Sequence, residues 1–226
     1  SPEDEHNSRV TTVEQTWWHQ LISATDSELV LNQSWSGSTI CYTGYEKEDY
    51  THLCFNTRLD KMYEAGTLNG IDTLLIFGGT NDDWCGAPEG ELKFEGWTNE
   101  EMYCALPAIG RLFCRVAEIL PDVKVYAIIN TELKPSIHDA LLKAAAHNGI
   151  PTICLSDIDK IWGHPSDIGM TQMGFMMALR MLIRSPLMFI MAISMAFTIN
   201  KKLSLVFMCI APIMFALILL IGSKAH

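Results

Sequence analysis

The chain has 226 residues and a formal net charge of −10, and it has no basic stripe of the kind that neutralises phosphates, which argues against binding to nucleic acid. Its 7 cysteines show no CxxC spacing, which predicts free thiols in a reducing compartment and excludes a disulfide frame or zinc site. All acidic residues lie at or before Asp167, and the basic residues that follow are Arg180, Arg184, Lys201, Lys202 and Lys224. This change in charge predicts two domains, 1–172 and 173–226.

The first domain alternates predicted helices with predicted strands. In chain order these are a helix over 13–24, a strand over 28–33, a helix over 57–65, a strand over 74–77, a helix over 99–120, a strand over 123–130, a helix over 136–148 and a strand over 151–156. This alternation predicts an α/β fold with a mainly parallel sheet and helices on both faces. Chemistry is then expected at the carboxyl ends of the strands.

The segment 72–83, IDTLLIFGGTND, joins an apolar strand directly to a Gly-Gly-Thr-Asn-Asp turn. Gly78 and Gly79 permit the sharp turn, which leaves Asn81 at the carboxyl edge of the sheet. An amide there can stabilise developing negative charge. The ordinary alternative is that Asn81 or Asp82 caps the following helix.

Two further motifs follow predicted strands at the same edge. His164, in WGHPS, can act as general base and acid in acyl transfer, or it is a surface histidine before a helix that starts with proline. Gly37, in SWSGS, lets a backbone N–H approach an oxyanion closely, or it is simply a turn glycine.

Taken together, SWSGS, GGTND and GHPS resemble blocks two, three and five of the SGNH or GDSL-type hydrolases, in that family's order and over roughly 13–170. The resemblance implies a flavodoxin-like α/β/α sandwich that hydrolyses a small ester or an acylated sugar, as an esterase, lipase or carbohydrate deacetylase without a metal or other cofactor. It also implies that Gly37 and Asn81 form the oxyanion hole and that His164 is the catalytic base.

The family block that carries the nucleophile has no counterpart in this sequence. That block, a Gly-Asp-Ser at the end of the first strand of the sheet, is expected upstream of Val13. Ser34, Ser36 and Ser38 belong to the second block, where a nucleophile would be misplaced. The resemblance therefore predicts a hydrolase that lacks its first strand and whose activity is impaired.

The acid that orients the histidine is also unassigned. The family usually has an Asp three residues before the His, where this chain has Ile161. Asp159 or Asp157 is the candidate for this role, although either is equally interpreted as an ordinary carboxylate at a strand end.

The second domain, 173–226, is predicted to form a two-helix transmembrane hairpin over 181–222. Its second apolar run, 203–222, has the length of about 20 residues that crosses a bilayer. The segment 174–222 resembles the third and fourth transmembrane helices of ABC-type exporter subunits, which makes another transporter subunit a candidate partner. Basic residues near the helix ends predict a membrane location with the α/β domain on the cytoplasmic side.

Three alternatives remain open from the sequence. The apolar tail is also compatible with a buried helical pair of a soluble core. The whole chain is also compatible with a membrane-anchored binding or transporter component that has no catalytic activity. The joining of two partial families is, finally, compatible with an artefactual fusion produced by gene prediction, sequence assembly or recombination.

Overall fold

The computed structural model of the protein describes residues 9–161 and 163–182. The chain divides into two compact units, 1–174 and 175–226. In the second unit, the described residues 175–182 are helical. The elements named below all belong to the first unit.

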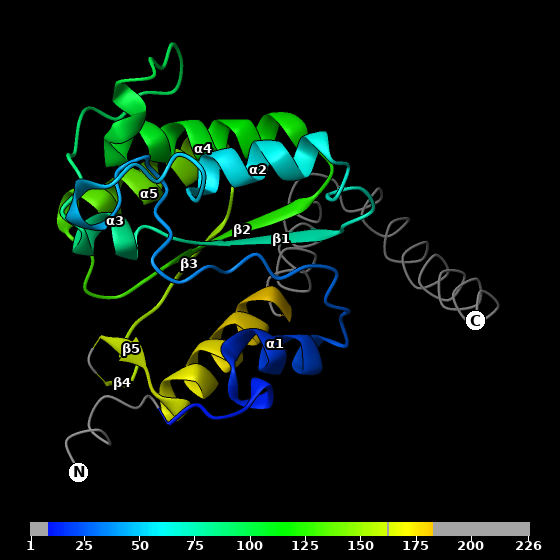
Figure 1. Cartoon of the computed structure of the whole chain (residues 1–226). Coiled ribbons are helices and arrows are strands. Elements are labelled where there is room, and N and C mark those ends of the chain that lie inside the picture. The colour runs from blue at the N-terminus through cyan, green and yellow to red at the C-terminus, as the bar shows by residue number, and fades with distance from the viewer. Residues whose placement is uncertain (1–8, 162, 183–226) are drawn as a thin grey trace, which may run out of the picture. The chain divides into compact units, whose positions relative to one another are not determined.

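A parallel sheet of three strands forms the centre of the first unit (Figure 1). Its strands have the order β1-β2-β3 and comprise Thr73–Phe77, Lys124–Ile129 and Thr152–Cys154. The register aligns Ile76 with Ala127 and Ile128 with Ile153. β2 has neighbours on both sides and is largely buried, whereas β1 pairs only with β2 among the described residues. The predicted α/β fold with a parallel sheet is confirmed.

Helices cover both faces of this sheet (Figure 1). One face carries α2, α4 and α5, which comprise Phe55–Glu64, Ala105–Ile119 and Pro135–His147. The other face carries α1 (Trp17–Thr25), where the ring of Trp17 meets the ring of Phe77 edge-on at 6.0 Å. A helix over 167–174 lies beside α1, so that a Cβ atom built on Gly174 would be 3.0 Å from Cβ of Gln20.

The remaining elements are short. α3 follows β1 at the carboxyl end of the sheet, and β4 and β5 form an antiparallel pair. The bounds are η2 Val13–Gln15, η3 Tyr45–Lys47, α3 Thr80–Trp84, η4 Glu101–Tyr103, β4 Lys160–Ile161 and β5 His164–Pro165.

The buried face of α4 forms much of the core of this unit. Its apolar residues recur at the spacing of one helical face, and the largest are Ile109, Leu112, Phe113 and Val116. They belong to one apolar cluster with side chains of β1, β2 and α5. Because burying one such side chain contributes about 1.5–3 kcal/mol, this face of α4 stabilises the layer of helices on the sheet.

The strand predicted over 28–33 does not form. No strand is present there, and Leu29, Val30 and Leu31 are 44%, 62% and 39% exposed. The backbone N–H and C=O groups of a strand need a neighbouring strand as partner, and no described strand pairs with this segment. The predicted strands over 74–77, 123–130 and 151–156 do form, as β1, β2 and β3.

The predicted membrane location, with the α/β domain on the cytoplasmic side, is wrong. None of the helices in the described ranges combines the length and the apolar character that crossing a bilayer requires. Most of the predicted hairpin over 181–222 lies outside the described residues.

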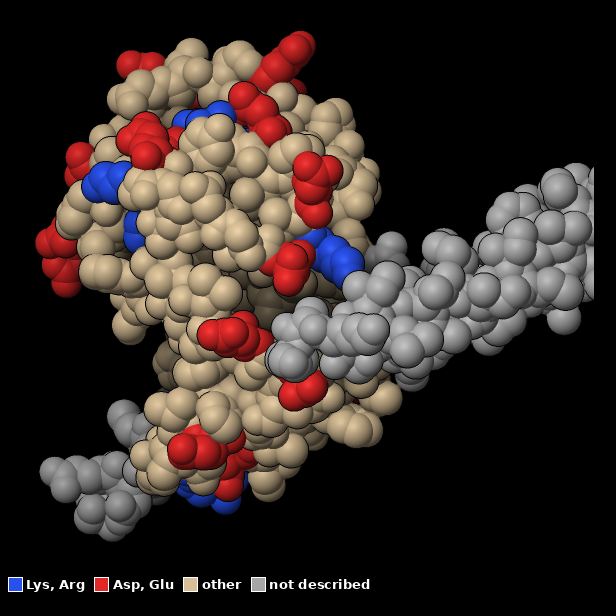
Figure 2. All heavy atoms as spheres, turned by 90° about the vertical axis from the view of Figure 1, so that its right-hand side faces the viewer, with Lys and Arg blue, Asp and Glu red and all other residues tan. Residues whose placement is uncertain are grey.

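The described surface carries the acidic character that the composition predicts. Figure 2 shows the face that looks to the right in Figure 1, where Asp and Glu side chains are more prominent than Lys and Arg. No basic patch of the kind that binds phosphates is visible on this face.

Candidate active site

Two glycines allow α3 to begin directly after β1. A Cβ atom on Gly78 would lie 2.7 Å from the ring of Phe55, and Gly79 has a φ of +97° that side chains rarely permit. Gly79 is also the N-cap of α3, without a capping side chain, so the interpretation that Asn81 or Asp82 caps this helix is wrong. The turn therefore places Asn81 and Asp82 in the first turn of α3, at the carboxyl edge of the sheet.

The side-chain amide of Asn81 is held in one orientation by two hydrogen bonds. Its Nδ2 donates to the carbonyl oxygen of Ser38 at 2.9 Å. Its Oδ1 accepts from the hydroxyl of Tyr45, also at 2.9 Å. The second Nδ2 hydrogen has no acceptor among the described residues, so it is available to an incoming oxygen atom.

The loop that contains Gly37 is fixed next to Asn81 by the buried carboxylate of Asp82. Both oxygens of Asp82 accept from the backbone N–H of Ile40, at 3.0 and 2.9 Å, and Oδ1 also accepts from that of Cys41 at 3.0 Å. Burial raises the pKa of Asp82, and these N–H donors oppose the shift. Gly37 itself has a φ of +75°, in the region that favours glycine.

A buried amide fixes the opposite side of the same loop. Asn56 of α2 is fully buried, and its Nδ2 donates to the carbonyl oxygens of Ile40 and Ala108, at 2.9 and 3.0 Å. Its Oδ1 accepts from Arg111 of α4 at 3.0 Å. The loop is thereby bonded directly to α2 and α3 and, through Asn56, indirectly to α4.

His164 reaches the same end of the sheet through contact with α3. Its ring meets the ring of Trp84 edge-on, with centroids 5.4 Å apart and planes at 86°. The preceding Gly163 packs so closely on Trp84 that a Cβ atom there would lie 2.9 Å from the indole. Asn81 lies one helical turn before Trp84, so α3 carries one predicted site residue, Asn81, and contacts the other, His164.

The two candidate acids do not contact His164. The carboxylate of Asp159 accepts from the hydroxyl of Ser166 and lies 3.9 Å from the guanidinium of Arg9. Asp157 is exposed, with a φ of 53°. Among the described residues, neither carboxylate forms a hydrogen bond or an ion pair with His164.

No described serine hydroxyl is bonded to His164 either. Ser34 and Ser36 are exposed in the loop before Gly37. The hydroxyl of Ser38 is buried and already engaged, because it donates to Leu53 O and accepts from Arg58, both at 2.8 Å. Among the described residues, His164 and the predicted oxyanion donors Asn81 and Gly37 therefore have no serine hydroxyl bonded to the histidine.

The cysteine nearest to this loop is not a substitute nucleophile. Cys41 is fully buried, and burial followed by the negative charge of Asp82 raises the pKa of its thiol. Since the thiolate is the reactive form, Cys41 is inert at neutral pH.

The sequence did not identify Tyr45, Asp82 or Asn56 as residues that hold the site. Each acts on a partner far away along the chain, such as Tyr45 on Asn81 and Asp82 on Ile40. The available signal was weak, because it consisted only of polar side chains in or next to helices α2 and α3 and of a tyrosine in a loop.

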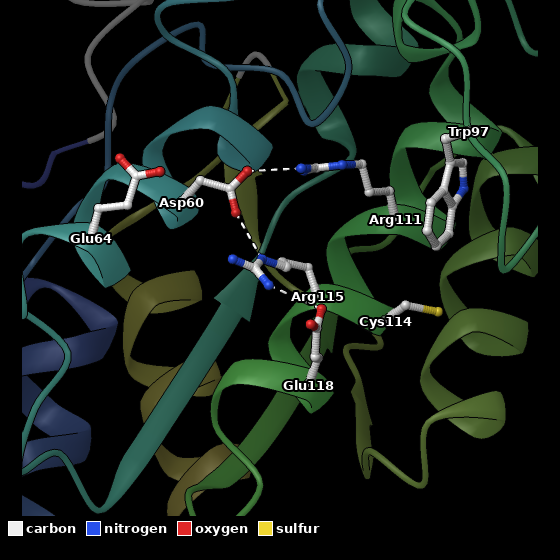
Figure 3. Close-up of a pocket in the computed structure, with 7 residues that line it drawn as sticks. All are labelled: Asp60, Glu64, Trp97, Arg111, Cys114, Arg115 and Glu118. Carbon is white, nitrogen blue, oxygen red and sulfur yellow. Dashed lines mark hydrogen bonds and ion pairs between the residues drawn. The ribbon is translucent and has the colours of Figure 1, made fainter.

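A separate pocket of about 360 Å³ lies along α2 and α4 (Figure 3). No predicted site residue lines it, and all of its charged groups except Glu64 pair with one another. Asp60 accepts from Arg111 and Arg115, at 2.8 and 2.9 Å, and Arg115 also pairs with Glu118 at 3.0 Å. We therefore interpret this pocket as a surface ion-pair network and not as the active site.

Replacing Asp60 by asparagine is expected to lower the free energy of unfolding by about 1–3 kcal/mol at pH 7, because the replacement removes two charge-assisted hydrogen bonds. Burial alone would raise the pKa of Asp60, but the bonds from Arg111 and Arg115 outweigh burial and lower it. A carboxyl whose pKa is lower in the folded chain stabilises above its unfolded pKa of about 3.9 and loses this contribution as the pH falls.

Urea unfolding at pH 7 and at pH 3 measures this difference, which is expected to shrink at the lower pH. Glu64→Gln is the matched control, because Glu64 lines the same pocket without an ion pair among the described residues. An equal loss of unfolding free energy in both variants would contradict the assignment of this stabilisation to the ion pairs of Asp60.

Comparisons with known proteins give the chain's family and agree with the fold. The family model described as GDSL-like Lipase/Acylhydrolase matches residues 1–179. A crystal structure of a GDSL-like lipase from Bacteroides ovatus is 41% identical, with a TM-score of 0.71 over 78% of this chain and 82% of that one. Another from Bacteroides uniformis is 42% identical, with a TM-score of 0.70 over 74% and 76%.

A more distant match has the same fold. A protein from Lactobacillus plantarum is 17% identical, with a TM-score of 0.58 over 80% of this chain and 92% of that one. Among curated proteins, none matches the sequence.

Proposed function

Since the chain belongs to the GDSL-like lipase/acylhydrolase family, we propose that its α/β unit is the scaffold of a serine ester hydrolase. The observations that support this best are the hydrogen bond from Asn81 to the carbonyl oxygen of Ser38, next to Gly37, and the packing of His164 on Trp84 of the same helix α3. Gly37, Asn81 and His164 supply two types of group that acyl transfer needs: hydrogen-bond donors for an oxyanion and a base.

In the proposed reaction, a serine oxygen attacks the ester carbonyl carbon while His164 takes the serine proton. The carbonyl oxygen gains negative charge and accepts from Nδ2 of Asn81 and from the backbone N–H of Gly37. His164 then returns the proton to the leaving alcohol as the C–O bond breaks. Water repeats the sequence on the acyl-enzyme and regenerates the serine.

We further propose that ester hydrolysis by this chain is impaired, because none of the described residues supplies the attacking serine. The unpaired edge of β1 and the exposed residues Leu29, Val30 and Leu31 support this proposal. A strand inserted between β1 and the segment 28–33 would pair with the edge of β1 and cover this apolar surface. Its carboxyl end would lie beside Asn81, where the nucleophile is needed.

We propose small esters or acylated sugars as substrates. Trp84 touches His164 and is 47% exposed, so its indole offers an apolar surface next to the base. A flat aromatic surface at this position can support either an acyl chain or a sugar ring.

The proposal is tested with a grafted chain, in which 5 apolar residues, the length of β1, and then Gly-Asp-Ser are joined ahead of Ser1. Hydrolysis of p-nitrophenyl acetate is expected to rise by at least about two orders of magnitude over the ungrafted chain, because that is roughly the smallest gain that a base or one oxyanion donor supplies. Changing the grafted serine to alanine is expected to remove the gain.

A folded grafted chain without this gain would contradict the proposal. So would ester hydrolysis by the ungrafted chain that Ser34→Ala or Ser36→Ala abolishes, since the nucleophile would then lie in the second block.

A further inference from the structure

Tyr45 touches both of the residues proposed to form the oxyanion hole. Its hydroxyl donates to Oδ1 of Asn81 at 2.9 Å. The edge of its ring lies beside Gly37, where a Cβ atom would be 3.9 Å from Cε2 of Tyr45. One partly buried side chain therefore spans the amide donor and the backbone donor.

The loop that presents Tyr45 is tightly built. Its ends are tied by hydrogen bonds from Tyr50 N to Tyr42 O at 2.7 Å and from Gly44 N to Glu48 O at 2.8 Å. A Cβ atom on Gly44 would lie 2.3 Å from the ring of Tyr50, so only glycine fits there.

Two residues directly after Tyr45 adopt an unfavourable backbone conformation. Glu46 and Lys47 have φ values of 56° and 62°, which residues with a side chain seldom adopt. Such strain persists only where the surrounding structure enforces it, and it clusters at functional sites. Here it turns the chain so that Tyr45 faces α3.

The carbonyl oxygen of Ser38, which can only accept, sets the orientation of the Asn81 amide, and the hydroxyl of Tyr45 stabilises that orientation by donating to Oδ1. With Oδ1 toward Tyr45, Nδ2 donates to Ser38 O. In the flipped orientation, Oδ1 would face the carbonyl oxygen of Ser38, and two acceptors would oppose each other. Burial raises the pKa of Tyr45, so the phenol keeps its proton as the donor at neutral pH.

We infer that Tyr45 is a positioning residue that holds the Asn81 amide in this orientation and packs beside Gly37. The consequence for ester hydrolysis rests on the proposed function, whereas the orientation of the amide does not.

The test is the side-chain amide signal of Asn81 in the full chain labelled with ¹⁵N-asparagine, identified by its loss in Asn81→Asp. In Tyr45→Phe this signal is expected to shift and to exchange with water about two- to tenfold faster, the change that follows from losing one hydrogen bond. Tyr50→Phe is the matched control, because it removes a hydroxyl from the same loop that has no hydrogen-bond partner among the described residues. Its Asn81 signal is expected to match the wild type.

Thermal unfolding of the same samples shows whether each variant is folded. An unchanged Asn81 signal in a folded Tyr45→Phe chain would overturn the inference, and so would equal changes in Tyr50→Phe. Because the amide signal is measured without catalysis, a grafted chain that failed to hydrolyse esters would leave the inference about Tyr45 intact.

Discussion

Replacing His164 by alanine in the grafted chain is expected to reduce ester hydrolysis to the level of the ungrafted chain. Without a base the serine hydroxyl keeps its proton, and loss of one member of such a catalytic unit costs about as much as loss of all of them, roughly four to six orders of magnitude in a complete enzyme. The measurement is the rate of p-nitrophenyl acetate hydrolysis across the pH range in which an imidazole titrates.

The control for this prediction is His52→Ala, which removes an exposed histidine from the loop after η3. Its hydrolysis rate is expected to match that of the grafted parent. A His164→Ala chain that keeps most of the parent activity while folding normally would show that another group acts as the base.

Asp82→Asn is expected to lower the free energy of unfolding by about 2–4 kcal/mol, because the carboxylate is fully buried and accepts N–H groups through both oxygens. An asparagine can present only one oxygen to Ile40 and Cys41. Its amide hydrogens would then face the N–H of Ile40, leaving donors opposed to each other. Urea unfolding followed by tryptophan fluorescence measures the loss. An unchanged m-value would show that the substitution does not alter the surface exposed on unfolding.

The adjacent carboxylate supplies the matched control. Asp83 accepts from the backbone N–H of Lys134 at 2.8 Å in an exposed position. Asp83→Asn is therefore expected to cost less than about 1 kcal/mol. If both variants lost the same amount, the burial of Asp82 would not be the cause of its effect.

The sequence allowed the order of the elements and the turn after β1 to be predicted, because both depend on local patterns. The apolar run over 74–77, followed by Gly78 and Gly79, predicts a buried strand and a sharp turn without knowledge of any partner. The helical spacing over 99–120 likewise identified α4 and missed only the short break before Ala105.

The features that could not be predicted depend on partners far away in the sequence. The segment 28–33 has the composition of a strand, but it stays irregular, and no described strand pairs with it. Asp82 and Tyr45 have no local signature, since their roles arise from contacts with Ile40 and Asn81 across different elements. The predicted roles of Gly37, Asn81, His164 and Asp159 remain predictions, and the geometry is most favourable for Asn81.

The backbone of the loop at Ile40 is bonded on both sides, by Asp82 through its N–H and by Asn56 through its carbonyl oxygen. Its peptide dipoles are therefore preorganised, and little reorganisation energy should be needed when negative charge develops nearby. The dipoles are oriented by folding itself.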